Sequence, residues 1–184
     1  MKRLLLILPL LALLIIPYSI FSQIVIDTSF VGANAKLLSI NDSTNTIKVE
    51  PKLRYGDVHR VTFYFGISGF NQTIPLNIQI QNCSHPPVLA AYSYDKINWT
   101  RIGGSSVSNY KEYSDTFTQS PVYFATGYPY LYDDVLNLAN SLTANPYVTI
   151  SDLAISEKGK AVKMFRFTDS CVADSTKDLI WVIG

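Results

Sequence analysis

The sequence is poor in the residues that build metal centres and catalytic clusters. It contains two cysteines, Cys83 and Cys171, and two histidines, His59 and His85, among 184 residues. A metal centre needs three or four ligands at close spacing, and these side chains show none. We therefore expect structural or solvent-exposed histidines and free, buried thiols, although export would permit a disulfide. The sequence offers no catalytic residue, no cofactor-binding residue and no metal ligand.

Charge is also scarce. Fifteen basic and fourteen acidic residues leave a formal net charge of +1, and charged residues make up only 16% of the chain. A nucleic-acid surface needs a clustered excess of Lys and Arg, so this balance gives no case for a nucleic-acid partner or an acidic substrate. With 48% hydrophobic residues, the composition is that of a globular protein rather than a disordered one.

One long hydrophobic run opens the chain. Two basic residues precede the almost wholly apolar segment 4–16, and small polar residues follow. This pattern predicts a signal peptide over residues 1–22 and export to the periplasm or the extracellular space. An uncleaved membrane anchor is the alternative, but Pro9 and Pro17 interrupt the run, which is short for a span of about 20 residues. No later segment could cross a membrane, so we expect no membrane association after cleavage.

Residues 23–125 have the pattern of short strands separated by turn residues. The clearest alternation of apolar and polar residues lies at 58–67 and 76–81, and a polar stretch at 41–45 is typical of a hairpin loop. Many short strands without a helical period predict an N-terminal antiparallel β-sandwich as an accessory domain. Further strands are expected at 24–30, 35–40, 47–50, 88–94, 99–102, 110–117 and 122–125.

The pattern changes in residues 126–184. Leu131, Val135, Leu138 and Leu142 share one helical face, and Asn145-Pro146 ends the helix. Strands are expected at 147–155, 162–168 and 179–183, with a tight hairpin at 157–160. The last strand is apolar on both faces, as in the centre of a covered sheet, and nothing after Gly184 can cover it. This segment therefore predicts an incomplete α/β unit, the start of a mixed sheet.

Three other groups of residues have a functional and a structural interpretation. Asp133 and Asp134 could be a catalytic pair, but adjacent residues on a helix diverge by roughly 100°. We therefore expect their negative charges to interact favourably with the dipole at the start of the helix. Residues 103–106, Gly-Gly-Ser-Ser, lack the lysine of a phosphate loop and the pattern of a nucleophile elbow, which favours a flexible turn. An aromatic group could line a sugar or peptide groove or pack at an interdomain seam. It comprises Tyr123, Phe124, Tyr128, Tyr130 and Tyr132.

Three stretches carry a resemblance to a known family. Residues 93–99, Ser-Tyr-Asp-Lys-Ile-Asn-Trp, look like a Ser-x-Asp-x-x-x-Trp turn, and residues 122–130 look like a Val-Tyr-Phe-Ala…Tyr-Pro-Tyr junction. Residues 155–160 followed by 179–184 look like a first hairpin and a central strand. Together they resemble the N-terminal part of zinc metallocarboxypeptidases of the carboxypeptidase A clan, in the cytosolic-carboxypeptidase-like branch. One departure is Gly159-Lys160, where that family usually has Gly-Arg.

The resemblance implies a parent protein whose chemistry lies downstream of this chain. That family binds zinc through a His-x-x-Glu pair placed directly after the strand that 179–183 resembles, and through a later His. Arg and Asn side chains hold the substrate's terminal carboxylate, and a late Glu is the general base. None of these positions exists here. The resemblance thus implies a truncated, secreted, zinc-dependent parent that removes C-terminal residues from peptide substrates, and a chain that is inactive alone.

A different class of function remains open at this point. The aromatic group and the low charge also suit an exported, non-catalytic β-sandwich module that binds a protein or glycan partner. The sequence indicates no oligomeric state.

Overall fold

The computed structural model describes residues 23–53, 59–180 and 182. It divides the chain into two compact units, with unit 1 ending at Pro129 and unit 2 beginning at Tyr130. The expected signal peptide at 1–22 lies outside the described residues. Among the residues described, no helix is both long enough and apolar enough to cross a membrane.

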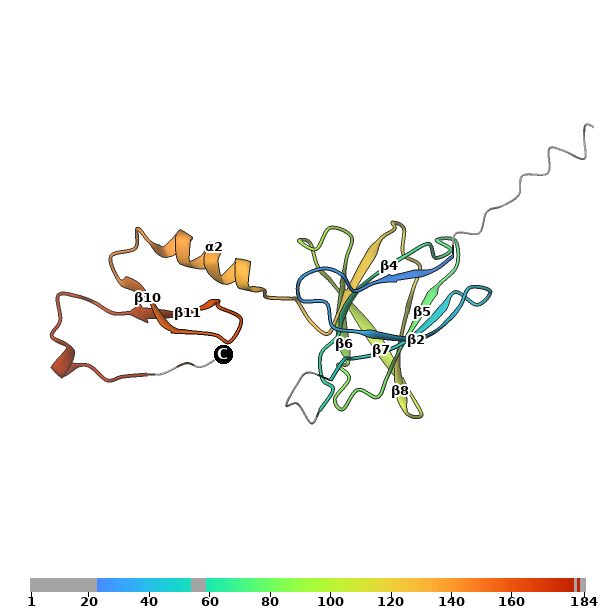
Figure 1. Ribbon diagram of the computed structural model, residues 1–184, viewed down its shortest axis with the longest axis horizontal. Helices are drawn as coiled ribbons and strands as arrows, with labels where there is room; N and C mark the ends of the chain where they lie inside the picture. The colour runs from blue at the N-terminus through green and yellow to red at the C-terminus, as the bar shows by residue number, and fades with distance from the viewer. Residues whose placement is uncertain (1–22, 54–58, 181, 183–184) are drawn as a thin grey trace, which may run out of the picture. The chain divides into compact units, whose positions relative to one another are not determined.

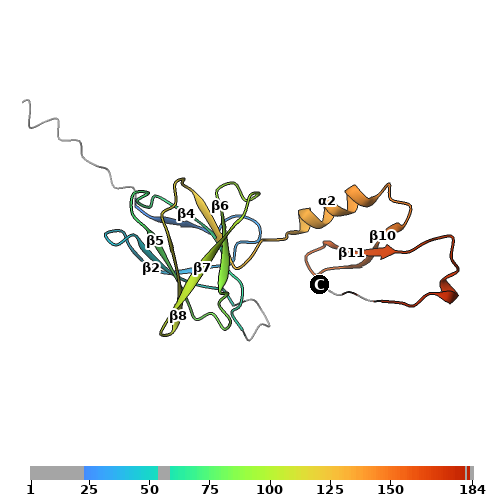
Figure 2. The same cartoon turned by 180° about the vertical axis from the view of Figure 1, so that it is seen from behind.

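The described residues of unit 1 form nine strands in one mixed sheet (Figures 1 and 2), in the order β1-β4-β9-β6-β7-β8-β5-β3-β2. Neighbouring strands are antiparallel except β3 and β5, so the expected antiparallel arrangement is wrong at that pair. The chain between them crosses to β4 near the opposite edge before it returns, and such a crossover makes parallel pairing possible. The strands are β1 (Val25–Asp27), β2 (Lys36–Asn41), β3 (Thr46–Glu50), β4 (Tyr64–Ser68), β5 (Leu76–Gln81), β6 (Leu89–Ser93), β7 (Thr100–Val107), β8 (Tyr110–Asp115) and β9 (Val122–Ala125).

Strand β7 joins the two halves of this sheet. Its first four residues pair with β6 and its last four pair with β8, so its partner changes between Gly103 and Gly104. The expected flexible turn at 103–106 is therefore wrong, since these residues are part of a strand. At the two free edges, the backbone N–H of Ile24, next to β1, donates to Asp42 Oδ1 beyond β2 at 3.0 Å. The sheet is thus nearly closed around its interior.

Both halves of the sheet contribute to one hydrophobic core. In β5 the apolar residues of the alternating pattern are fully buried and the polar residues between them are not. Phe63, Phe65, Tyr113 and Phe124 pack against one another with ring centroids 5.2–6.4 Å apart. Burial of each such side chain contributes about 1.5–3 kcal/mol relative to exposure. This core gives unit 1 the larger share of the buried apolar surface.

The predicted strand at 58–67 is shorter in the structure. Only its second half is a strand, β4, and Val58 lies outside the described residues. Isolated contacts rather than a strand ladder serve the backbone before β4: Asn34 Nδ2 donates to the Thr62 carbonyl at 2.7 Å, and the Phe63 N–H donates to Thr126 Oγ1 at 2.7 Å. Regular pairing therefore begins only at Tyr64.

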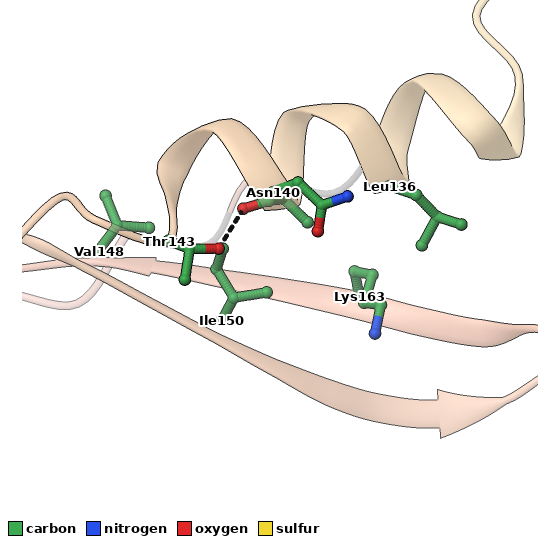
Figure 3. A pocket seen from close by; sticks show the side chains of 7 residues that line it. Leu136, Asn140, Thr143, Val148, Ile150 and Lys163 are labelled. Atoms are coloured by element: carbon green, nitrogen blue, oxygen red, sulfur yellow. Dashed lines mark hydrogen bonds between the residues drawn. The ribbon is translucent and has the colours of Figure 1, made fainter.

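The described part of unit 2 contains the helix α2 (Tyr132–Leu142) and a hairpin of β10 (Val148–Ile155) and β11 (Ala161–Phe167). A short 3-10 turn, η2 (Asp174–Thr176), follows the hairpin. The Leu131 N–H donates to Asp134 Oδ2 at 2.6 Å, so the acidic first turn does cap the helix. The expected apolar face is rotated, because Ala139 is buried while Leu138 is 41% exposed. In Figure 3 Leu136 and Asn140 point from α2 toward the strands.

The end of unit 2 differs from the expectation. The hairpin turn forms as predicted, with Gly159 at a φ of 73° and the Ser156 N–H bonded to the Lys160 carbonyl at 2.8 Å. The predicted central strand at 179–183 is wrong for its described residues, since Leu179, Ile180 and Val182 are not in a strand and are 77–91% exposed. β10 and β11 pair only with each other among the described residues. A strand needs a neighbour for its backbone hydrogen bonds, and here none runs beside it.

Candidate functional site

The few potential metal ligands stay dispersed. Among the described residues no three His, Cys, Asp or Glu side chains are grouped closely enough to hold a metal ion. His59 and His85 are exposed, as expected. Both cysteines are free; Cys83 is half-buried, and its burial raises the pKa of its thiol, but Cys171 is exposed, so the expectation of buried thiols is wrong there. The described residues therefore do not fit the catalytic zinc of the family that the sequence resembles.

The aromatic residues of 123–132 are divided between the two units. Phe124 is fully buried in the core of unit 1. Tyr128 is half-exposed, with the Arg101 guanidinium 4.2 Å above its ring, and Tyr130 is 63% exposed. Tyr132 belongs to unit 2, where the ammonium of Lys160 lies 4.6 Å from its ring centroid. Within unit 1 the buried Phe124 and the half-exposed Tyr128 therefore do not line one groove.

The turn at 93–99 is held by its own serine and aspartate. Ser93 Oγ accepts from the backbone N–H groups of Asp95 and Lys96 at 3.2 and 2.9 Å. Asp95 accepts from the Ile97 and Asn98 N–H groups at 2.8 and 2.7 Å, and from the Asn98 side-chain amide. The Asn98 contacts are the main reason why the pKa of Asp95 lies far below its usual range. This carboxylate orders the turn, and it is not poised for proton transfer.

The same turn packs against two half-buried aromatic residues of unit 1, Phe30 and Tyr123. Trp99 Nε1 donates to the Lys96 carbonyl at 3.1 Å. The Lys96 ammonium lies 4.2 Å from the Phe30 centroid and 4.4 Å from the Tyr123 centroid. Because an internal cation already occupies these ring faces, they are not an open stacking platform for a sugar. This region therefore does not support the alternative function as a glycan-binding module.

A cavity of about 290 Å³ lies in unit 2 between α2 and the hairpin (Figure 3). The Lys163 ammonium at its edge is paired with Asp152 Oδ1 at 2.6 Å, a contact that raises the pKa of Lys163. Thr143 Oγ1 donates to the Ala139 carbonyl at 3.1 Å. The lining holds no histidine, cysteine or carboxylate, its hydroxyl donates to a backbone carbonyl and its ammonium is ion-paired, so no activated nucleophile lies there. Its residues are Leu136, Ala139, Asn140, Thr143, Val148, Ile150 and Lys163.

One network at 166–177, centred on Asp174, connects the end of unit 2 to its hairpin. Arg166 of β11 pairs with Asp174, and this contact is the main cause of the lowered pKa of Asp174. The Lys177 ammonium donates to Thr168 Oγ1 at 2.8 Å and to Asp174 Oδ1 at 3.2 Å. These exposed pairs are structural and contribute little stability each. Neither unit, as described, holds a complete catalytic constellation.

Solved structures share the fold of this chain, although no protein-family model and no curated protein matches it. A crystal structure of a carboxypeptidase A candidate from Shewanella denitrificans OS-217 is similar, with a TM-score of 0.70 and 20% identity. A metallo-carboxypeptidase from Burkholderia cenocepacia is similar at a TM-score of 0.69 and 16% identity. A metallo-carboxypeptidase from Pseudomonas aeruginosa, in complex with (2-guanidinoethylmercapto)succinic acid, is similar at a TM-score of 0.67 and 18% identity.

These similarities cover 77–79% of this chain but only 39–40% of the solved chains. The chain therefore spans about two fifths of the length of the structures it matches. At these identities the likeness shows a shared, carboxypeptidase-like fold. The matched share is larger than the whole of unit 1, so it includes residues of unit 2.

Proposed function

We propose that these residues are the N-terminal portion of an exported zinc metallocarboxypeptidase-like protein that removes residues from the C-termini of peptides. In this proposal residues 23–125 are its accessory β domain, a nearly closed sheet rather than the expected sandwich, and residues 126–184 begin its catalytic domain. The observation that carries the proposal is the shared fold with metallo-carboxypeptidases, which includes residues of unit 2 as well as unit 1 and covers about two fifths of those proteins. The turn at 93–99 and the junction at 122–130 support the cytosolic-carboxypeptidase-like branch.

The chain by itself does not supply the chemistry of such an enzyme. The family's zinc pair has the form His-x-x-Glu, but Thr62 follows His59 at that spacing and Val88 follows His85. Within the described ranges no alternative group of three ligands replaces it. A catalytic zinc needs three protein ligands and one open position. In the proposed parent these ligands come from residues beyond Gly184, and zinc there activates water and polarises the peptide carbonyl.

The packing of each unit supports the role proposed for it. Unit 1 has a well-packed core, and the polar groups of its turn at 93–99 form hydrogen bonds within the turn itself. Both features suit a structural accessory domain. Unit 2 has a helix that packs on a hairpin, and its Leu179, Ile180 and Val182 side chains are exposed, which suits a piece of a larger sheet. Export depends on the predicted signal peptide, and N-terminal sequencing of secreted protein should begin at Gln23.

The proposal is tested by extending the reading frame. The DNA after the codon for Gly184 should continue into Arg-His-x-x-Glu or Gln-His-x-x-Glu. The extended protein should release C-terminal residues from a panel of unblocked peptides, while the 184-residue chain, as the matched control, should release none. An extended frame without the zinc pair, or an extended protein that binds zinc but cleaves no peptide in the panel, would contradict the proposal.

A further inference from the structure

The chain's two histidines lie beside each other in unit 1, although they are far apart in the sequence. The centroids of the His59 and His85 rings are 6.4 Å apart, and the ring planes meet at 78°. Both side chains are exposed. Nothing in their sequence spacing indicates this pairing, and the proposed peptidase chemistry does not use it.

The folded structure, and not only the two loops, brings these histidines together. The Ser84 N–H donates to the Arg60 carbonyl at 2.8 Å, which joins the residues next to each histidine. The carboxylate of Glu50 at the end of β3 is buried and accepts from Asn82 Nδ2 at 2.6 Å and from Arg60 Nη1 at 3.5 Å. The same β3 residue therefore anchors both histidine-bearing segments.

The ring nitrogens are available to a ligand. Ser84 Oγ lies 3.5 Å from His59 Nδ1, so this contact leaves His59 Nε2 free. In the part of the chain that the structure describes, no other hydrogen bond reaches either imidazole. A histidine whose second ring nitrogen is held by a neighbouring polar group is oriented for metal binding. Neutral imidazole is the commonest metal ligand in proteins.

The separation of the rings suits a shared ion after a small adjustment. Two imidazoles that bind one tetrahedral ion at about 2.1 Å from each nitrogen have ring centroids roughly 5 Å apart. A closing movement of about 1 Å is accessible to exposed side chains, whose rotamers change on the nanosecond scale. We propose that His59 and His85 together bind one late first-row divalent cation, Cu²⁺, Ni²⁺ or Zn²⁺, with water completing its coordination.

The site should bind its ion weakly. It has two protein ligands, and nearby Lys36 and Arg60 outnumber the single carboxylate of Glu50 that pairs with both, which lowers the affinity for a cation. A chelator should therefore remove the ion completely. Affinity should rise from Zn²⁺ or Ni²⁺ to Cu²⁺, and Mg²⁺ should not bind, because it prefers oxygen ligands. This inference does not depend on the proposed peptidase parent.

Calorimetric titration of the purified, chelator-treated chain with NiCl₂ tests the site. One ion should bind per chain, and His59→Ala and His85→Ala should each weaken binding roughly tenfold or more, since even the loss of an outer-shell partner has such an effect. Cys171→Ser, which removes an exposed thiol in unit 2, is the matched control and should bind like the wild type. Circular dichroism should show that all variants are folded.

A second measurement needs no variant. The electron paramagnetic resonance spectrum of the Cu²⁺-loaded chain should show coupling to two imidazole nitrogens, and to one in either histidine variant. Three outcomes would overturn the proposal: no saturable Ni²⁺ binding by the wild type, unchanged binding by either histidine variant, or loss of binding in Cys171→Ser.

Discussion

Gly104 is the position where a single methyl group should test the architecture of unit 1 most sharply. A Cβ atom added there would lie 2.4 Å from Cε1 and 2.8 Å from Cδ1 of Tyr113. Carbon atoms in contact are normally about 3.5–4.0 Å apart, so the ring would have to move by more than about 1 Å. Tyr113 is fully buried, packs against Phe124 at 5.2 Å between centroids, and donates its hydroxyl to the Pro87 carbonyl at 2.5 Å.

The expected cost of Gly104→Ala has two parts. Overpacking a tight core typically costs about 1–3 kcal/mol, and weakening the tyrosine hydrogen bond adds about 0.5–1.5 kcal/mol. The variant should therefore lose about 2–4 kcal/mol of unfolding free energy in urea, measured by far-ultraviolet circular dichroism. Gly103→Ala is the matched control, because nothing lies within 4 Å of its added Cβ. Its free energy of unfolding should stay within about 1 kcal/mol of the wild-type value, because alanine here changes mainly the entropy of the unfolded chain.

A double variant distinguishes ring contact from a general effect of alanine. Tyr113→Leu is itself destabilising, but in that background Gly104→Ala should cost much less than in the wild type, because the opposing ring atoms are gone. Equal stability of the Gly103→Ala and Gly104→Ala proteins would refute the placement of β7 against β8 at this point.

The other predictions concern pH, the helix cap and the labile part of the chain. Contacts from Asn82 first, and then from Lys36 and Arg60, lower the pKa of Glu50, so its stabilisation is present above the ordinary glutamate pKa of about 4.3 and is lost as pH falls below it. Glu50→Gln should thus have a lower free energy of unfolding than the wild type at pH 7. In urea titrations this difference in unfolding free energy should shrink toward pH 3; a difference that does not change with pH contradicts the prediction. Asp134→Ala should destabilise α2 by about 1 kcal/mol through the lost cap, whereas Asp133→Ala should not. Early proteolytic cuts should fall within 126–132 and leave unit 1 intact, because Ala139 is the only buried side chain among the described residues of unit 2; survival of unit 2 instead would contradict the difference in packing.

Local pattern was enough to predict much of the secondary structure. Residues 76–81 alternate strictly, and β5 forms there because one apolar face can be buried. The parallel pairing of β3 with β5 was not predictable, because strand direction depends on where the intervening chain crosses the sheet. Residues 103–106 have a loop-like composition, but they form a strand since glycine fits beside Tyr113. That requirement exists only in the folded protein.

The same distinction applies to the site and to the end of the chain. The apolar residues at 179–183 predicted a strand by composition, yet a strand also requires a partner for its backbone, which pattern cannot supply. The proximity of His59 and His85 had no sequence signal because it depends on the contacts of Glu50 with two separate segments. The motifs at 93–99 and 122–130, by contrast, are each contiguous in the sequence, so they could indicate a carboxypeptidase-like fold without any knowledge of long-range contacts.

Zinc stoichiometry tests the central claim most directly. The extended reading frame and the 184-residue chain should be purified in parallel, dialysed first against a chelator and then against zinc, washed, and measured by mass spectrometry for metal content. The account predicts one tightly held zinc per extended protein, together with release of C-terminal residues from peptides, and no retained zinc or activity in the 184-residue chain. One tightly held zinc in the 184-residue chain, or none in the extended protein, would contradict it.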